Sequence, residues 1–139
     1  MSIEKAIKKA YDKMFERDWD KIYWCIDIHD TLLNSNYDGL ATEFAPGSIE
    51  CLKKIQEYDE TVLILWSACH DFDKEKYMNM FAEQGVNFKY FNENPDEANT
   101  KVGNFREKFY FSILIDDKAG FDSETDWKEI SRIVDWART

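Results

Sequence analysis

Hydrophobic residues recur along this chain at two different spacings, which predict two kinds of element. Between residues 3 and 16 they recur every three or four positions, with charged residues between them, which predicts an amphipathic helix. Residues 22–28, 61–66 and 109–115 are instead almost continuously apolar, and residues 86–91, in which apolar residues predominate, are also expected to form a strand. Uninterrupted apolar runs of this length are typical of strands that are covered on both faces, as in a parallel sheet.

Helices are expected to separate these strands, because apolar residues return to helical spacing after the first, second and fourth of them. The residues suited to start or end these helices are Ser48 for the first, Asp71 or Asp73 with Gly85 for the second, and Thr125 or Asp126 for the third. Strands that alternate with helices predict one α/β domain over residues 1–139, a three-layer Rossmann-like sandwich with a central parallel sheet.

The segment between the first strand and the first of these helices has a different character. Residues 34–47 are rich in Asn, Ser, Asp, Gly and Pro, and the pair Asp38-Gly39 is a strong turn signal. We expect a small hairpin there, with residues 36–37 facing residues 40–41.

Polar side chains follow three of the predicted strands at the point where each strand ends. They are Asp27, His29, Asp30 and Thr31 after the first, Ser67 with His70 nearby after the second, and Asp116 with Asp117 after the fourth. Ligands of open α/β sheets bind outside the carboxyl ends of the strands, so carboxylates from distant segments are expected to converge there. Two such carboxylates can hold Mg²⁺ together with water and a substrate phosphate, and one of them can attack phosphorus.

Composition and charge narrow the function classes. The net charge of −10 disfavours nucleic-acid polymers, which are bound by basic surfaces, although a metal ion between carboxylates can reverse the local field for a small anion. The N-terminal ten residues have helical spacing and lysines instead of the apolar run of a signal peptide. Three cysteines without paired metal-ligand spacing indicate a reducing compartment. We therefore expect a cytoplasmic protein with no membrane segment.

In motif order the chain resembles the haloacid dehalogenase-like superfamily of phosphohydrolases. Ile26-Asp27-Ile28-His29-Asp30-Thr31-Leu32 is similar to its first motif, a strand followed by Asp-x-Asp-x-Thr. Residues 63–67 are similar to the second, a strand ending in Ser or Thr, and residues 113–117 followed by Asp122 to the fourth, a strand ending in Asp-Asp. The resemblance spans residues 21 to 122 and implies a small capless member, with residues 32–47 as a small flap region.

The resemblance also implies roles for single residues. Asp27 would be the nucleophile and a ligand of Mg²⁺, and the metal would also be bound by the backbone carbonyl of His29 and by Asp116. Ser67 would bind the phosphoryl group together with a lysine, for which Lys108 and Lys101 both qualify. We favour Lys108, because it immediately precedes the fourth strand. Residues with supporting or uncertain roles are Asp117, Asp122, Thr31 and Lys101.

His29 is the departure from the motif, because the family's phosphatases have there an aspartate that protonates the leaving oxygen. Asp30 is one position further on, so in an extended chain its side chain would point the opposite way. Histidine titrates near neutral pH and can itself act as acid and base. The expected activity is therefore a Mg²⁺-dependent phosphomonoesterase using an aspartyl-phosphate on Asp27. The alternative is a metal- or phosphate-binding protein with little turnover.

The remaining expectations are modest. His70 and Cys69 lack the spacing of a zinc site, and Trp24 and Trp66, which lie within strands, are interpreted as core residues. Asn92 follows the third strand near the same edge of the sheet, where it could touch a substrate. The expected partner is a phosphorylated substrate, whose identity the sequence leaves open together with the oligomeric state.

Overall fold

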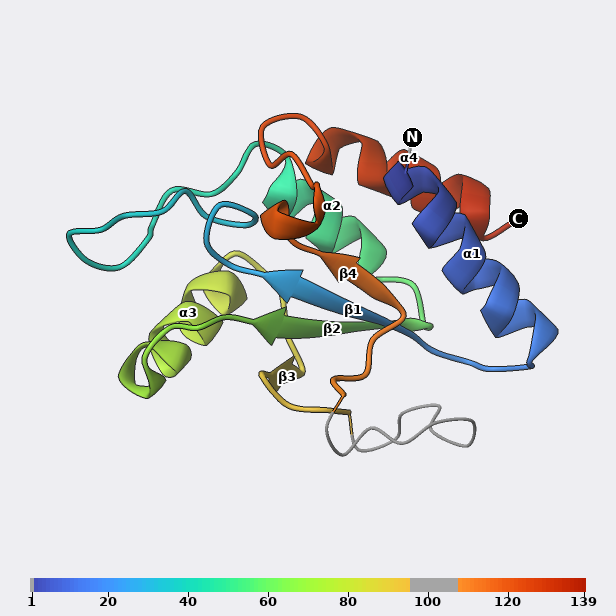
Figure 1. The fold of residues 1–139 in the computed structure, drawn as a ribbon, viewed down its shortest axis with the longest axis horizontal. Helices are drawn as coiled ribbons and strands as arrows, with labels where there is room; N and C mark the ends of the chain where they lie inside the picture. Colours follow the sequence, from blue (N-terminus) through green and yellow to red (C-terminus); the bar gives the residue numbers. More distant parts are fainter. Residues whose placement is uncertain (1, 96–107) are drawn as a thin grey trace.

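Strand β1 lies at the centre of the sheet and carries the first of the predicted site residues at its end. The structure is a computed structural model that describes residues 2–95 and 108–139. Within these residues four parallel strands form one sheet in the order β3-β2-β1-β4 (Figure 1). The strands are β1 Ile22–Asp27, β2 Thr61–Trp66, β3 Tyr90–Phe91 and β4 Ile113–Ile115.

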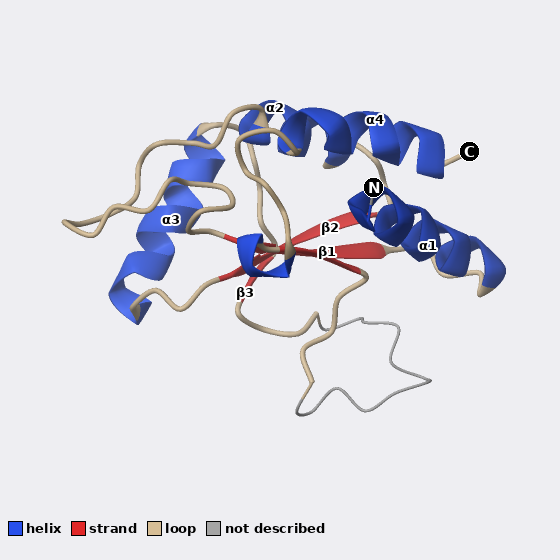
Figure 2. Ribbon diagram, turned by 45° about the horizontal axis from the view of Figure 1, so that its top comes forward, coloured by secondary structure: helices blue, strands red, loops and turns tan. Residues whose placement is uncertain are grey.

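The described residues form four α-helices and one short 3-10 helix beside this sheet. Helices α1 and α4 pack against each other, and α4 also packs against α2. Figure 2 shows α1, α2 and α4 on one side of the sheet, with α3 beside the ends of the strands. The helices are α1 Ser2–Glu16, α2 Ser48–Ile55, α3 Asp71–Glu83, η1 Asp117–Ala119 and α4 Trp127–Ala137. The expected α/β, Rossmann-like fold with a central parallel sheet is confirmed.

Each face of the sheet has its own apolar cluster, as the alternation of side chains along a strand requires. On the helix side, Trp24 and Ile26 of β1 are fully buried in the main core, together with residues from all four α-helices. The opposite face carries a smaller cluster, in which Tyr110 packs edge-on against Tyr23 with 5.3 Å between ring centroids. Tyr110 belongs to the segment that leads into β4, so this segment covers the second face in the part of the chain that is described.

Two of the strands are shorter than their predicted ranges. Val86 and Phe88 are buried but lie before β3, and Phe109 to Phe111 lie before β4. Apolar residues bury themselves against the core whether or not their backbone joins a ladder, so an apolar run overestimates strand length. The predicted strands 86–91 and 109–115 are wrong over these outer residues.

Local turn chemistry also differs from the expectation at two places. Helix α2 begins at Ser48, but its N-cap is Gly47 at φ 78°, and the hydroxyl of Ser48 makes no capping bond. The expected hairpin forms its turn near Asp38, where the backbone N–H donates to Asn36 Oδ1, but the pairing lies further out. A single antiparallel bridge joins Leu33 to Phe44.

The remaining predictions concern the ends of elements and membrane segments. Gly85, at φ 84°, follows α3 as predicted. Asp126 is the N-cap residue of α4, although its carboxylate accepts from the N–H of Asp122 instead of capping the helix. Within the described ranges, no helix has the length and apolar character needed to cross a membrane.

Candidate active site

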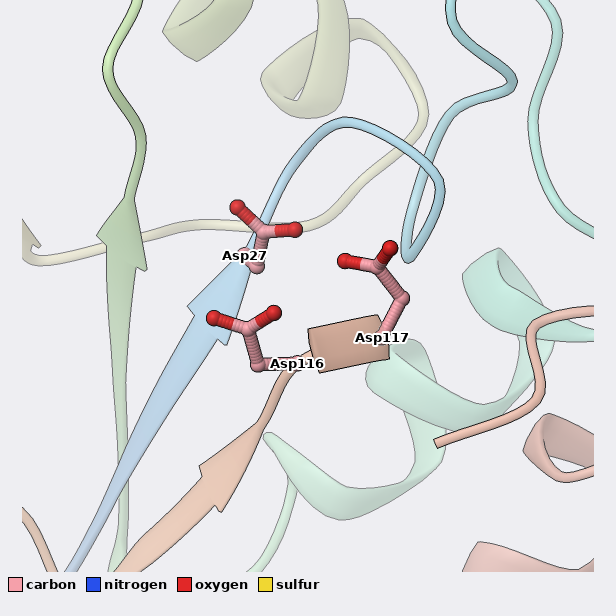
Figure 3. A group of neighbouring side chains, drawn as sticks. All are labelled: Asp27, Asp116 and Asp117. Atoms are coloured by element: carbon pink, nitrogen blue, oxygen red, sulfur yellow. The ribbon is translucent and has the colours of Figure 1, made fainter. Parts of the chain in front are cut away.

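Three aspartates meet at the carboxyl edge of the sheet. Asp27 ends β1, and Asp116 and Asp117 directly follow β4. The two strands are neighbours in register, with Ile26 paired to Ile115, so the residues that follow are brought side by side. One carboxylate oxygen from each aspartate lies within 4.8 Å of those from the other two (Figure 3). The convergence expected of Asp27 and Asp116 is present, and Asp117 belongs to the same group.

Thr31 connects these two strand ends. Its side-chain hydroxyl donates to Asp27 Oδ2 at 3.1 Å and accepts from the backbone N–H of Asp117 at 3.0 Å. Thr31 is fully buried, and its carbonyl oxygen accepts a 2.8 Å bond from the indole of Trp127 in α4. The threonine therefore fixes the orientation of Asp27 and the position of the loop after β4 at once.

The proximity of the carboxylates changes the acidity of Asp27. Burial, followed by the negative charge of Asp116, raises the pKa of Asp27 to about 7, against the opposing effect of the bond from Thr31. Asp117 adds to the increase through a side-chain hydrogen bond and its own charge. Three close carboxylates are thus mutually unfavourable when all are ionised, a situation that a cation relieves.

His29 lines the same cleft as Asp27, as the alternation of side chains predicts. Its Nε2 lies 3.1 Å from the hydroxyl oxygen of Tyr77, a buried residue of α3, and the two rings meet edge-on. The same hydroxyl accepts from the backbone N–H of Ala41 at 3.3 Å. Tyr77 therefore engages one ring nitrogen of His29, Nε2.

The backbone is not extended at Asp30, as the alternation argument assumed. Asp30 has φ 60°, in the left-handed region, where Asp is tolerated better than most residues. The chain turns there, with the N–H of Asp30 donating to the carbonyl of Leu33, and Asp30 is among the described residues that line the cleft. Its Oδ1 accepts a 3.2 Å bond from the N–H of Ser35.

Ser67 follows β2 and lines the cleft with little exposed surface. Its hydroxyl accepts from the N–H of Cys69, and its backbone is held from the end of β3 by Asn92. The Asn92 side chain accepts from the N–H of Ser67 at 2.8 Å and donates to its carbonyl at 2.6 Å. Asn92 thus contacts Ser67, and its φ of 54° suits asparagine. The sequence places Asn92 near this edge as a possible substrate contact, but it does not indicate its bonds to Ser67.

The identity of the expected phosphate-binding lysine stays a prediction. Lys108 is exposed and is not among the residues that line the cleft, and Lys101 lies outside the described residues. Lys118, which sequence reasoning missed, does line it. The backbone N–H of Lys118 donates to Asp116 Oδ1 at 2.9 Å, which ties this lysine to the metal-ligand candidates. Its place two residues after Asp116 was the available signal.

The cleft has a volume of about 510 Å³ and combines carboxylates with aromatic surface. Trp66, interpreted from the sequence as a core residue, is 39% exposed and lines it, so that interpretation is wrong. Trp66 ends β2 on the same face as Ile64, away from the helices, and its ring contacts Phe109 there. The described residues that line the cleft are Asp27, His29, Asp30, Tyr37, Trp66, Ser67, Ala68, Asp116, Asp117 and Lys118.

Two other residues considered from the sequence do not reach this group. Asp122 is exposed, and its Oδ1 accepts from the backbone N–H of Glu124, which makes it part of the turn before α4. His70 is exposed and stacks on Phe72 at 5.2 Å. Neither residue lines the cleft.

The donor set of the aspartate group fits a hard divalent cation. Asp27, Asp116 and Asp117 offer only carboxylate oxygens, which are the ligands that Mg²⁺ prefers, and they remain half-buried beside an open cleft with room for water and a phosphate. Histidine and cysteine, which soft transition metals select, are absent from this group. These aspartates could therefore hold Mg²⁺.

Comparison with known proteins bears on the fold. No protein-family model matches the chain, and no curated protein matches it. A solved structure described as a conserved protein from Bacteroides thetaiotaomicron is similar, with a TM-score of 0.67 and 23% sequence identity. The match covers 86% of this chain and 93% of that one. At this identity the likeness establishes a shared fold only.

Proposed function

We propose that this protein is a Mg²⁺-dependent phosphomonoesterase of the haloacid dehalogenase-like type, which acts through an aspartyl-phosphate on Asp27. The observation that supports the proposal most is the grouping of the Asp27, Asp116 and Asp117 carboxylates within 4.8 Å of one another at the carboxyl edge of a parallel sheet. The Ser67 hydroxyl and Lys118 line the same cleft, where they can bind phosphate oxygens. The free state of all three cysteines is compatible with the cytoplasmic location we propose.

A bound metal ion would offset the negative charge of the cleft. Among the described residues that line it, the four aspartates Asp27, Asp30, Asp116 and Asp117 outnumber the single lysine, so these residues alone repel a phosphate dianion. Mg²⁺ held by Asp27, Asp116 and Asp117, and by the His29 carbonyl according to the family resemblance, would supply compensating positive charge. It would also favour the ionised Asp27 that the chemistry requires.

The proposed reaction has two displacements at phosphorus. In the first, an Asp27 carboxylate oxygen forms a bond to phosphorus while the bond from phosphorus to the leaving oxygen breaks, and protonated His29 gives its proton to that oxygen. In the second, a water oxygen attacks phosphorus, neutral His29 takes the proton, and the bond to Asp27 breaks to release phosphate. Thr31 keeps the attacking carboxylate oriented through its 3.1 Å bond.

The test is release of phosphate from a generic aryl phosphate with Mg²⁺. Asp27→Asn is nearly isosteric and removes the nucleophile, so turnover is expected to fall to background. Asp122→Asn is the matched control, because this aspartate is exposed and outside the cleft, and its activity is expected to equal that of the unmodified protein. Turnover that survives Asp27→Asn would exclude Asp27 as the nucleophile.

A second candidate function is metal and phosphate binding with little turnover, favoured by one observation. His29 stands where the family has an aspartate, and one of its ring nitrogens is already engaged by Tyr77. The variant His29→Asp separates the two functions. If His29 is the working acid and base, the variant is expected to hydrolyse no faster than the unmodified protein. A large gain in hydrolysis would identify the histidine as the group that silences the site.

A further inference from the structure

Trp66 places an exposed indole directly beside the nucleophile candidate. It is the last residue of β2, it is paired in register with Asp27 on β1, and it immediately precedes Ser67. Its ring meets Phe109 at 4.5 Å between centroids and remains 39% exposed. A large aromatic side chain in this position is available to whatever is attached to a phosphate bound at Ser67.

Tyr37 adds a second aromatic ring to the same cleft. Its side chain is 96% exposed, although the flap backbone around it is ordered by a bond from the Asn36 amide to the carbonyl of Leu40 and by one from the N–H of Asp38 to Asn36. The flap therefore presents Tyr37 at the cleft without burying it. An exposed aromatic ring at a cleft whose backbone is held in place is a typical ligand contact.

The chemistry of the remaining cleft residues restricts what these rings can contact. Apart from Trp66, Tyr37 and Ala68, the described lining residues are polar or charged, and most of the charge is negative. A leaving group with further anionic charge is disfavoured there. Stacking on an aromatic ring needs no charge and is available to any planar π system.

We propose that the site takes phosphomonoesters whose leaving group carries a planar aromatic ring, which stacks on Trp66 and Tyr37. This inference rests on the proposed phosphomonoesterase function and specifies its substrate class. Two sources share the chemistry: a nucleoside monophosphate, with the ring one sugar away from the phosphate, and an aryl phosphate, with the ring on the reacting oxygen. The two differ in reach, so the experiment treats them in separate arms.

The experiment compares matched substrate pairs at equal Mg²⁺. The first arm measures kcat/KM for adenosine 5′-monophosphate and for ribose 5-phosphate, which lacks the base. The second measures it for O-phosphotyrosine and O-phosphoserine. The two esters of a pair differ in intrinsic reactivity. The readout is therefore the ratio of their kcat/KM values, aromatic over non-aromatic, and how this ratio changes when a protein ring is removed. Since a stacked base contributes on the order of a tenfold effect, Trp66→Ala and Tyr37→Ala are each expected to lower the ratio about tenfold in the preferred arm.

Phe72→Ala is the matched control, because Phe72 is a 70% exposed aromatic residue that stacks on His70 and does not line the cleft. It is expected to leave both ratios unchanged. Trp66→Leu is a second variant that keeps apolar bulk but not the planar ring, and it is expected to behave like Trp66→Ala. Thermal unfolding of each variant identifies those that fold.

Binding provides a readout that does not depend on turnover. His29→Ala, which keeps the three carboxylates that would hold Mg²⁺, is titrated calorimetrically in the presence of Mg²⁺ with adenosine 5′-monophosphate, ribose 5-phosphate, O-phosphotyrosine and O-phosphoserine, with and without Trp66→Ala. Tighter binding of an aromatic ester that is lost with Trp66 supports the inference, even if no substrate is hydrolysed and the proposed function fails. The inference is overturned if, in both arms, neither the kcat/KM ratios nor the affinities change when Trp66 or Tyr37 is replaced. That outcome leaves the phosphomonoesterase proposal intact.

Discussion

The hydroxyl oxygen of Tyr77 lies 3.1 Å from Nε2 of His29, across the gap between helix α3 and the turn after β1. Tyr77 is 2% exposed, and Ala41 of the flap donates its N–H to the same oxygen. A single buried hydroxyl thus contacts His29, the proposed acid and base, and holds the flap beside it.

Removing the Tyr77 hydroxyl should affect both activity and stability. Tyr77→Phe is expected to lower kcat roughly two- to tenfold, the value of one net hydrogen bond, because His29 is no longer held at Nε2. The variant should also lose about 1–3 kcal/mol of folding free energy, because the Ala41 N–H is left without its acceptor. The measurements are phosphate release and denaturant unfolding.

The control for this prediction is the His29→Ala background. His29→Ala alone should lower kcat on the order of 10²- to 10⁴-fold, the usual contribution of acid–base catalysis. Adding Tyr77→Phe to it should cost stability but no further activity, since the group that Tyr77 orients is gone. An additive loss of activity in the double variant would show that Tyr77 does not act through His29.

The choice between lysines is open to a direct comparison. Lys118→Ala is expected to reduce kcat/KM roughly 10- to 100-fold, because a charge-assisted contact to phosphate is worth about 1.5–3 kcal/mol. Lys108→Ala is expected to have little effect, because its side chain does not line the cleft. The reverse order of effects in a steady-state assay would restore Lys108 as the phosphate-binding lysine.

Stability should depend on pH through Asp27. Its pKa is raised from 3.8 to about 7 in the folded protein, so folding favours its protonated form. The resulting stabilisation is present below pH 3.8 and is lost as pH rises through about 7. In the presence of a chelator, raising the pH from about 5 to about 8 is therefore expected to lower the melting temperature of the unmodified protein relative to that of Asp27→Asn.

Magnesium should have the opposite pH dependence, because it binds the ionised carboxylates. We expect added Mg²⁺ to raise the melting temperature more at about pH 8 than at about pH 5, and to have a much smaller effect on Asp27→Asn. Equal stabilisation of Asp27→Asn and the unmodified protein would place the cation elsewhere.

Asn92 should contribute to the position of Ser67 and not only to a turn. Asn92→Gly keeps the left-handed φ of 54° accessible but removes both bonds to the Ser67 backbone. It is expected to lose roughly 1–3 kcal/mol of stability and to raise KM for phosphate esters. Gln56→Gly is the matched control, because the Gln56 side chain also makes two bonds to backbone, to the Gly85 carbonyl and the Asn87 N–H, and does not line the cleft. An unchanged KM in Asn92→Gly would limit Asn92 to a structural role.

The pattern of apolar residues determines the sheet and most of its helices. Strand β2 coincides with its predicted bounds, and β1 ends one residue before its predicted end, because a continuous apolar run followed by polar residues has few other folded solutions. The same pattern places Asp27 and Asp116 at one edge, since parallel neighbouring strands end together. It overestimates β3 and β4, because burial and ladder pairing are separate properties.

The sequence by itself determined the order of the strands' polar ends and hence which residues could form a site. Only the tertiary structure decided which of them meet and what surrounds them. Several features of the site depend on packing between segments far apart in the chain. They are the left-handed turn at Asp30, the contact of Tyr77 with His29, the hydrogen bonds of Asn92 to Ser67 and the exposure of Trp66. The spacing of residues along one strand carries no information about such contacts, because the partner's position is set by how the elements pack.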